Sequence, residues 1–379
     1  MLAAVQAFGL ESPGGGPRIM RALLKGAAQP WMSVCVGVTP PPPCSIGEEA
    51  FIQTRPHLGR IERTRFRRYI EPFFPRAEQN AQAKLERICR DSEAACMHSI
   101  AHGNDFWISF QTADKLGIPF YLTVHDRFEY NLRKSNSLQQ NVERLGVAWR
   151  NAQGRMVISQ EMGDGLNALY GEAPFLTVTD GLTEIKPSIE RKADRLAVYF
   201  MGALHTSYHA NFRALAESLI IVQRKNPSLK VSLTIRGSSF PGNAGDLPVH
   251  CLPWGSEEEV SRDIHEADIL YLPLPFGKEY EPFWRYSLST KMVTYVGSGM
   301  PILYHGPAEA AAGRMLISNN ACMPAVSLDS IEIADVLQNA QSRLAEIVGG
   351  AQILASNKFM LEDQRIRFWG MISGAGRSK

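Results

Sequence analysis

A lysine and a group of hydroxyl side chains form the densest polar cluster in the chain, at residues 287–291. The run Ser-Leu-Ser-Thr-Lys opens a segment with helical spacing that extends to Gly297. Lysine binds phosphate as a point charge, and the free amides of a helix N-terminus add hydrogen-bond donors. A lysine in the first turn of a helix is repelled by the positive end of the helix dipole, and a nearby anion would offset this unfavourable energy. The cluster therefore predicts a phosphate contact, with a solvated, serine-capped turn as the alternative. Its members are Ser287, Ser289, Thr290 and Lys291.

Two further candidates follow strands that the pattern predicts in the first half of the chain. Gly14–Gly16 separates an apolar strand from a helix, where glycine lets the backbone approach a ligand, although the spacing is not GxGxxG. His125 follows a buried strand at 120–124, at the edge where doubly wound sheets bind their ligands. We expect Gly15 and Gly16 to contact phosphate or sugar and His125 to act on the substrate. A tight turn and a structural histidine are the alternatives.

The histidines and cysteines show no metal-ligand spacing. His98 and His102 flank another expected strand end, and together with His125 they match no zinc site. The six cysteines are scattered, without a CxxC pair. We therefore expect no metal, and we interpret the cysteines as reduced thiols of a cytoplasmic protein.

Positive charge is concentrated in one segment, residues 54–76. Seven arginines face two glutamates there, a local charge of +5, so the rest of the chain sums to −3. Aromatic and aliphatic residues interleave with these arginines on one helical face, up to Pro72. This pattern is typical of a helix on an anionic membrane surface, and a packed helix with a solvated basic face is the alternative. We assign to the membrane or acceptor surface Arg63, Arg65, Arg67 and Arg68.

Short apolar strands alternate with longer amphipathic helices along most of the chain. The rhythm is most regular after residue 195, where it closes with one helix expected from Asp329 through Ile347. Such alternation predicts parallel sheets covered on both faces. We expect an α/β chain of two Rossmann-like doubly wound domains, with the linker at 182–195 and a ligand site in the cleft between the domains.

Composition excludes several classes of protein. The 379 residues are 45% hydrophobic and 21% charged, which is ordinary for a globular chain and unlike a disordered or collagen-like one. A net charge of +2 supplies no overall attraction to nucleic acid. No apolar run approaches the ~18 residues of a membrane-spanning helix, and the first ten residues lack the basic leader of a signal peptide.

The longest motif lies in the second half and resembles a known signature. Residues 267–273 (ADILYLP) and 287–303 (SLSTKMVTYVGSGMPIL) are similar to the signature of the retaining glycosyltransferases of family 4, which have the GT-B fold. Weaker similarities are the glycine run, the sequence VISQEM at 157–162, and DGL at 180–182. The tail at 359–369 resembles the helix that returns to the first domain in that family.

The resemblance implies transfer of a sugar from a nucleotide-diphosphate sugar, with retained configuration and without a metal. It implies an acceptor-side domain at 1–185, a donor-binding domain at 186–350, and a returning helix at 351–379. His125 would lie beside the donor sugar and the acceptor, as the catalytic histidine. The residues that would contact the donor are Gly15, Gly16, His209, Ser287, Ser289, Thr290, Lys291 and Thr294.

The chain departs from this family at four positions. The usual pair of glutamates eight residues apart is replaced by Tyr286 and Thr294. The usual arginine and lysine near the first strand of the second domain are replaced by Ala203 and His209. Lys291 is the remaining cation of the expected donor site.

These observations predict a glycosyltransferase that builds a cell-surface polysaccharide or glycolipid and uses the nucleotide sugar as substrate, with no separate cofactor. Its expected partners are that donor, a glycan or lipid-linked acceptor, and an anionic membrane surface, but not nucleic acid. We expect it in the cytoplasm, peripheral to the inner face of the membrane. The alternatives are a nucleotide-sugar epimerase or hydrolase of the same fold, and a non-catalytic scaffold subunit.

Overall fold

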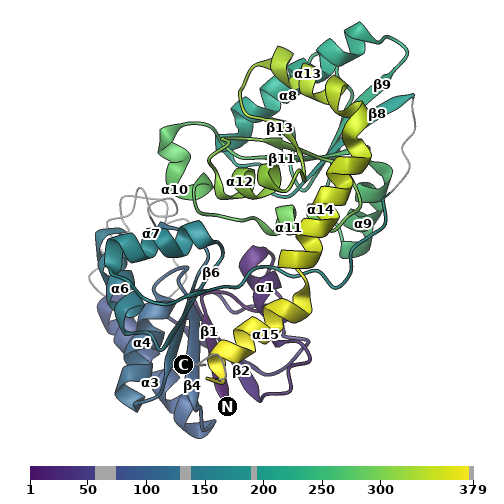
Figure 1. Cartoon of the computed structure of the whole chain (residues 1–379). Helices are drawn as coiled ribbons and strands as arrows, with labels where there is room; N and C mark the ends of the chain where they lie inside the picture. Colours follow the sequence, from purple (N-terminus) through teal and green to yellow (C-terminus); the bar gives the residue numbers. More distant parts are fainter. Residues whose placement is uncertain (56–73, 129–137, 189–193, 375–379) are drawn as a thin grey trace. The chain divides into compact units, whose positions relative to one another are not determined.

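The computed structural model describes residues 1–55, 74–128, 138–188 and 194–374 of the chain. The chain divides into two compact units (Figure 1). Unit 1 comprises Met1–Asp180 together with the C-terminal segment from Leu361, and unit 2 comprises Gly181–Met360. The boundaries expected from the sequence were residues 185 and 350.

The described part of unit 1 contains a seven-stranded sheet in which every pair of neighbours is parallel, in the order β3-β2-β1-β4-β5-β6-β7. All residues of β1 and β5 are buried, as expected of central strands covered on both faces. The strands are β1 (Leu2–Gln6), β2 (Trp31–Gly37), β3 (Glu49–Gln53), β4 (Cys96–Ile100), β5 (Phe120–Val124), β6 (Gly154–Val157) and β7 (Leu176–Thr177).

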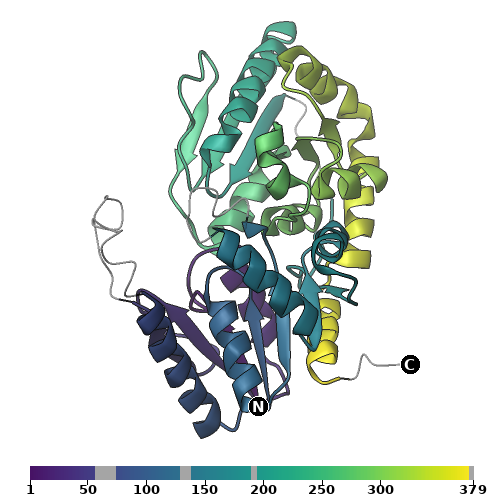
Figure 2. The same cartoon turned by 90° about the vertical axis from the view of Figure 1, so that its left-hand side faces the viewer.

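The helices of unit 1 pack in pairs on this sheet. Helices α3 and α4 lie side by side (Figure 2). Helix α1 lies beside α15, whose Trp369 indole donates a hydrogen bond to the Leu23 carbonyl at 3.1 Å. The helices described in unit 1 are α1 (Gly15–Leu24), α3 (Phe74–Asp91), α4 (Asp105–Leu116), α6 (Leu138–Asn151), α7 (Gln160–Tyr170) and α15 (Leu361–Ile372).

The described part of unit 2 contains a six-stranded parallel sheet in the order β10-β9-β8-β11-β12-β13. Its strand order reverses between β8 and β11, which is the switch point where doubly wound sheets bind ligands. The strands are β8 (Arg195–Met201), β9 (Lys230–Arg236), β10 (Val249–Leu252), β11 (Ile269–Pro273), β12 (Ile302–His305) and β13 (Met323–Ala325).

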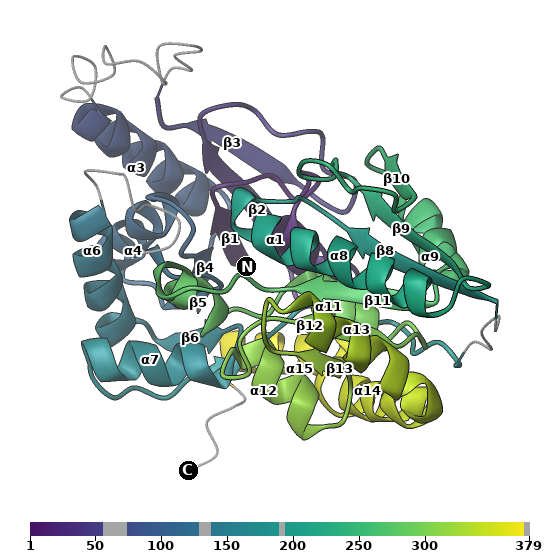
Figure 3. The same ribbon diagram turned by 90° about the horizontal axis from the view of Figure 1, so that it is seen from above.

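A compact apolar core holds the helices of unit 2 to its sheet. Helices α8 and α13 lie side by side (Figure 3). In this core, Phe212 packs edge to face against Phe200 at 5.0 Å and against Tyr271 at 5.3 Å. The helices are α8 (His209–Lys225), α9 (Glu257–Glu266), α10 (Glu281–Trp284), α11 (Thr290–Val296), α12 (Ala311–Ser318), α13 (Ser330–Asn339) and α14 (Leu344–Lys358), with short 3₁₀ turns η3 (Thr206–Tyr208), η4 (Lys278–Tyr280) and η5 (Ala340–Arg343).

The single helix expected from Asp329 through Ile347 is wrong, because η5 divides it into α13 and α14. The Asp329 carboxylate accepts hydrogen bonds from the amides of Ile331 and Glu332 and starts α13 as expected. Helix α13 packs on α8, whereas α14 packs on α11. We infer that η5 allows consecutive helices to pack on two different neighbours, α8 and α11.

The segment after Asp180 is more tightly packed than a linker with few apolar contacts. The Leu182 amide donates to the Phe359 carbonyl at 2.7 Å, and the Lys186 amide donates to the Gly297 carbonyl at 2.8 Å. A Cβ at Gly297 would lie 2.5 Å from a Leu182 methyl carbon, so only glycine leaves room for that side chain. The glycines of the sequence motif at 297–299 therefore have a packing role in unit 2.

Candidate functional site

Lys291 lies at the carboxyl edge of the unit 2 sheet, close to the end of β8. Its Nζ is 3.7 Å from the centroid of the Phe200 ring, and a Cβ at Gly202 would lie 3.5 Å from its Cε. Burial lowers the pKa of this ammonium group to about 7. Among the described residues, no carboxylate forms an ion pair with Lys291. A half-buried cation without a carboxylate partner is suited to an anionic ligand.

The hydroxyl side chains around Lys291 are placed by the first turn of α11. The Ser289 hydroxyl caps the helix by accepting from the Met292 amide at 3.2 Å, and Thr294 donates to the Thr290 carbonyl at 3.1 Å. Ser287 precedes this turn and is buried. The helix is only seven residues long, so Lys291 itself is the stronger attraction for an anion.

His209 is the other titratable residue of unit 2 that we expected to contact the nucleotide-sugar donor. It is the first residue of α8 and is half-buried. It follows β8 through the turn η3, so it lies, like Gly202, beyond the carboxyl end of β8. In the loop between Gly202 and His209, the Leu204 amide donates to Ser238 Oγ at 2.8 Å, and Ser238 donates to the Gly202 carbonyl at 3.0 Å. This bond ties the loop after β8 to the loop after β9.

The sequence interpretation missed Trp254, which the structure places at the same edge. Its side chain is 68% exposed, although tryptophan is a residue that normally buries its ring. One ring face covers Gly237, the residue after β9, because a Cβ there would lie 3.1 to 3.2 Å from three indole carbons. Trp254 follows β10 by two residues. Its position directly after a short strand is the signal that could have identified it.

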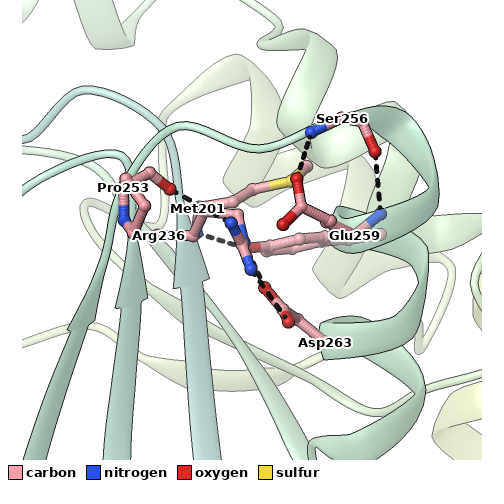
Figure 4. A network of polar contacts seen from close by, with 7 residues as sticks. Met201, Arg236, Pro253, Ser256, Glu259 and Asp263 are labelled. Atoms are coloured by element: carbon pink, nitrogen blue, oxygen red, sulfur yellow. Dashed lines mark hydrogen bonds and ion pairs between the residues drawn. The ribbon is translucent and has the colours of Figure 1, made fainter.

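Polar side chains at the end of β9 and on α9 bond one another (Figure 4). Arg236 pairs with Asp263 through two nitrogens and donates to the Pro253 carbonyl at 3.1 Å. Ser256 and Glu259 form a capping box at the start of α9. The first turn of α9 is acidic, so it repels anions, and an uncharged aromatic ligand suits this end of the edge better than a phosphate.

His125 directly follows β5 in unit 1, as the sequence predicted, and only 7% of it is exposed. Burial, reinforced by the charge of His102, lowers the pKa of His125 to about 3. Its imidazole is therefore neutral near pH 7 and is suited to hydrogen bonding rather than to carrying a charge.

The glycine turn packs beside this histidine. Gly14 has a φ of 131°, and α1 begins at Gly15. A Cβ at Gly16 would lie 2.9 Å from both His102 Cε1 and Phe8 Cε1, so glycine at this position lets two side chains approach the helix start. His102 in turn packs edge to face on His125, at 5.6 Å between ring centroids.

His98 lies inside β4 rather than beside its end. It is fully buried and forms a 2.7 Å hydrogen bond with Thr123, and its ring packs on Phe368 of α15. These contacts make it a core residue. In the part of the chain that the structure describes, no group of three or more potential ligands is arranged to hold a metal ion. Arg63, Arg65, Arg67 and Arg68 lie outside the described residues.

No protein-family model and no curated protein sequence matches the chain. Its fold is similar to that of Anabaena HepE, solved with UDP-glucose, at 13% identity over 99% of this chain and 100% of that one, with a TM-score of 0.67. It is also similar to a UDP-forming α,α-trehalose-phosphate synthase from Burkholderia xenovorans, solved with glucose-6-phosphate, at 12% identity over 98% and 100% of the chains, with a TM-score of 0.66. A putative UDP-N-acetylglucosamine 2-epimerase from Listeria monocytogenes matches at 10% identity over 100% and 97%, with a TM-score of 0.60.

These similarities, together with the two parallel sheets, define the class of fold: two Rossmann-like doubly wound α/β units of the GT-B type. The predicted fold class is therefore confirmed. Among the described residues, no helix is both long enough and apolar enough to cross a membrane.

Proposed function

We propose that this chain is a glycosyltransferase that moves a sugar from a nucleotide-diphosphate sugar to a glycan or lipid-linked acceptor. The observation that carries the proposal is Lys291, a half-buried cation without a carboxylate partner at the binding edge of unit 2. Two of the structures with a similar fold, HepE and the trehalose-phosphate synthase, are described with UDP-glucose or as UDP-forming. In our proposal, Lys291 and the hydroxyls of Ser287 and Thr290 stabilise the leaving diphosphate, where charge develops in the transition state.

We place the nucleobase of the donor on Trp254. The edge of the sheet runs from Lys291 at the end of β8 to Trp254 beyond β9, and the Ser238 hydrogen bonds join the two loops. A diphosphate at Lys291 and a base stacked on the exposed indole face match the two ends of a nucleotide. The acidic first turn of α9 disfavours the reverse orientation.

We assign the acceptor to unit 1. His125 would hydrogen-bond the sugar or the incoming hydroxyl from the end of β5, and Gly15 and Gly16 would present backbone amides to the donor phosphates. Retention of configuration and independence from metals are further parts of this proposal. So is a location in the cytoplasm at an anionic membrane surface, contacted through Arg63, Arg65, Arg67 and Arg68.

An epimerase is the second candidate, because the Listeria structure with the same fold is described as a putative epimerase. Epimerisation needs an acid and base pair at the substrate. Three carboxylates that could serve have other partners: Asp180 pairs with Arg18 at 3.1 Å, Glu281 pairs with Arg285, and Asp126 lies 3.7 Å from His102 Nε2. These pairs favour the transferase.

Calorimetric titration with nucleoside diphosphates of several bases tests the proposal. We expect one of them to bind, with an affinity that depends on Lys291. Surface Lys225, at the far end of α8 and paired with Asp335, supplies the control variant Lys225→Ala. Absence of binding by every diphosphate and every nucleotide sugar would favour a non-catalytic scaffold.

A further inference from the structure

His102 joins the two candidate elements of unit 1. Its ring packs edge to face on Phe8 at 5.5 Å and on His125 at 5.6 Å between centroids. Its Cε1 occupies the space that a Cβ at Gly16 would need. The His102 imidazole therefore contacts both the turn that starts α1 and His125, the residue after β5.

One carboxylate lies close to this imidazole, and a second one bonds the turn that carries it. His102 Nε2 lies 3.7 Å from Asp126 Oδ2, on the residue next to His125. Asp105, which is 2% exposed, accepts a hydrogen bond from the Gly103 amide at 3.1 Å and so fixes the turn after β4. The charges that face His102 are thus those of Asp126 and Asp105, with His125 as its titratable neighbour.

His102 and His125 differ in their access to solvent. The side chains of His102 and Asp126 are 23% and 31% exposed, whereas His125 is only 7% exposed. A ligand at this edge therefore meets the His102–Asp126 pair as well as His125. Nε2 of His102 thus faces a carboxylate at 3.7 Å rather than an apolar surface, which packing alone does not require.

We propose that His102, oriented by Asp126, is a positioning residue that seats the His125 imidazole against the glycine turn. This inference rests on the proposed function, in which His125 contacts the sugar or the acceptor. His102 contacts His125 on one side and the Gly16 backbone on another. It thereby keeps the position of His125 relative to the start of α1 fixed. Misplacement of a reacting group by a fraction of an ångström to 1 Å costs rate rather than affinity.

Three substitutions separate positioning from packing. His102→Phe keeps an aromatic ring but removes Nε2, and we expect turnover to fall about tenfold or more, on a scale where tenfold corresponds to ~1.4 kcal/mol. His102→Gln restores a side-chain donor towards Asp126 and should recover most of that loss. Asp126→Ala should lower turnover as much as His102→Phe does, and the double variant should be no slower than either single one. Donor affinity should fall much less than turnover, because Lys291 and Trp254 of unit 2 make the principal proposed donor contacts and only the Gly15 and Gly16 amides of unit 1 adjoin His102.

Two results would contradict a positioning role for His102. If His102→Phe keeps more than half of the parent turnover, or if the losses of the two single variants add in the double variant, the ring only packs and the inference fails. Thermal unfolding of each variant shows whether the protein is folded.

A spectroscopic measurement decides the inference even if no transferase activity is found. In protein labelled with ¹⁵N-histidine, the His102 signals are those that His102→Phe removes. We expect their nitrogen shifts to report a proton on Nε2, and Asp126→Ala to change them. Identical shifts in the parent and in Asp126→Ala would overturn the pairing, independently of whether the proposed function holds.

Discussion

Lys291 Nζ lies 3.7 Å from the centroid of the Phe200 ring, so the cation of α11 rests on the aromatic face of the neighbouring strand β8. The negative face of an aromatic ring attracts a cation, but it does not replace the hydration that burial removes. The loss of hydration outweighs the attraction of the ring, and burial lowers the pKa of Lys291 to about 7. The lysine is therefore at its protonation midpoint near neutral pH, and an anionic ligand would stabilise its charged form.

The first prediction concerns the pH dependence of diphosphate binding. An anion raises the pKa of a lysine beside it, so above pH 7 the complex holds a proton that the free protein has lost. Affinity for the nucleoside diphosphate should then fall as pH rises, by at most about tenfold per pH unit. Calorimetry in buffers of different ionisation enthalpy should detect proton uptake at pH 8.

Lys291→Arg is the matched control for this effect, because a guanidinium stays charged over the same range. Its affinity should be nearly independent of pH between 7 and 9. If parent and variant show the same pH dependence, Lys291 does not face the diphosphate.

The second prediction concerns Trp254. Stacking of a base on an aromatic side chain contributes roughly 1–3 kcal/mol, so Trp254→Ala should weaken binding of a nucleoside diphosphate by about 5- to 150-fold. Trp254→Phe should restore part of the loss. Binding of inorganic pyrophosphate, which has no base, should be the same in all three proteins. An equal loss for pyrophosphate would mean that Trp254 supports the loop instead of the base.

The third prediction concerns His125. His125→Ala should lower turnover far more than donor affinity, because a contact that strengthens in the transition state contributes mainly to rate. Since the pKa of His125 is about 3, its titration should leave no step in the pH profile of turnover between pH 5 and 8. Turnover within about twofold of the parent, where tenfold is ~1.4 kcal/mol, would make His125 a structural residue.

The fourth prediction concerns the basic segment at residues 54–76. Each arginine near an anionic lipid surface contributes ~1 kcal/mol, within about a Debye length. Replacing Arg63, Arg65, Arg67 and Arg68 with serine should release the protein from anionic vesicles in sedimentation, and high salt should have the same effect on the parent. Activity on a soluble acceptor analogue should survive. Equal pelleting of both proteins at low salt would show that these arginines form a solvated face.

The strands that line the candidate sites were predictable from sequence because they are short, buried and apolar. The expected strand at 120–124 agrees with β5, which His125 follows, and Asp329 starts α13 as expected. Local chemistry decides such features, so one sequence is enough to find them. The edge strand β3 was missed because only Ile52 of its five residues is fully buried, which leaves little apolar pattern.

The site relationships were less predictable because they depend on packing between segments distant in sequence. Nothing in the local sequence tells that Gly16 gives room to His102, or that Gly237 is covered by Trp254. The break between α13 and α14 also follows from which helices they pack against rather than from helical propensity. Lys291 was found from its motif, but its burial and its contact with Phe200 required the structure.

The central claim is a glycosyltransferase with its donor site at Lys291. It is tested most directly by measuring the release of nucleoside diphosphate from a panel of nucleotide sugars by the parent and by Lys291→Ala. We predict slow donor hydrolysis without acceptor for at least one nucleotide sugar. Because a charged hydrogen bond contributes roughly 1.5–3 kcal/mol, Lys291→Ala should bind the diphosphate product about 10- to 150-fold more weakly, while Lys225→Ala behaves like the parent. An epimerised donor, or a folded Lys291→Ala variant with unchanged diphosphate affinity and hydrolysis, would contradict a glycosyltransferase with its donor site at Lys291.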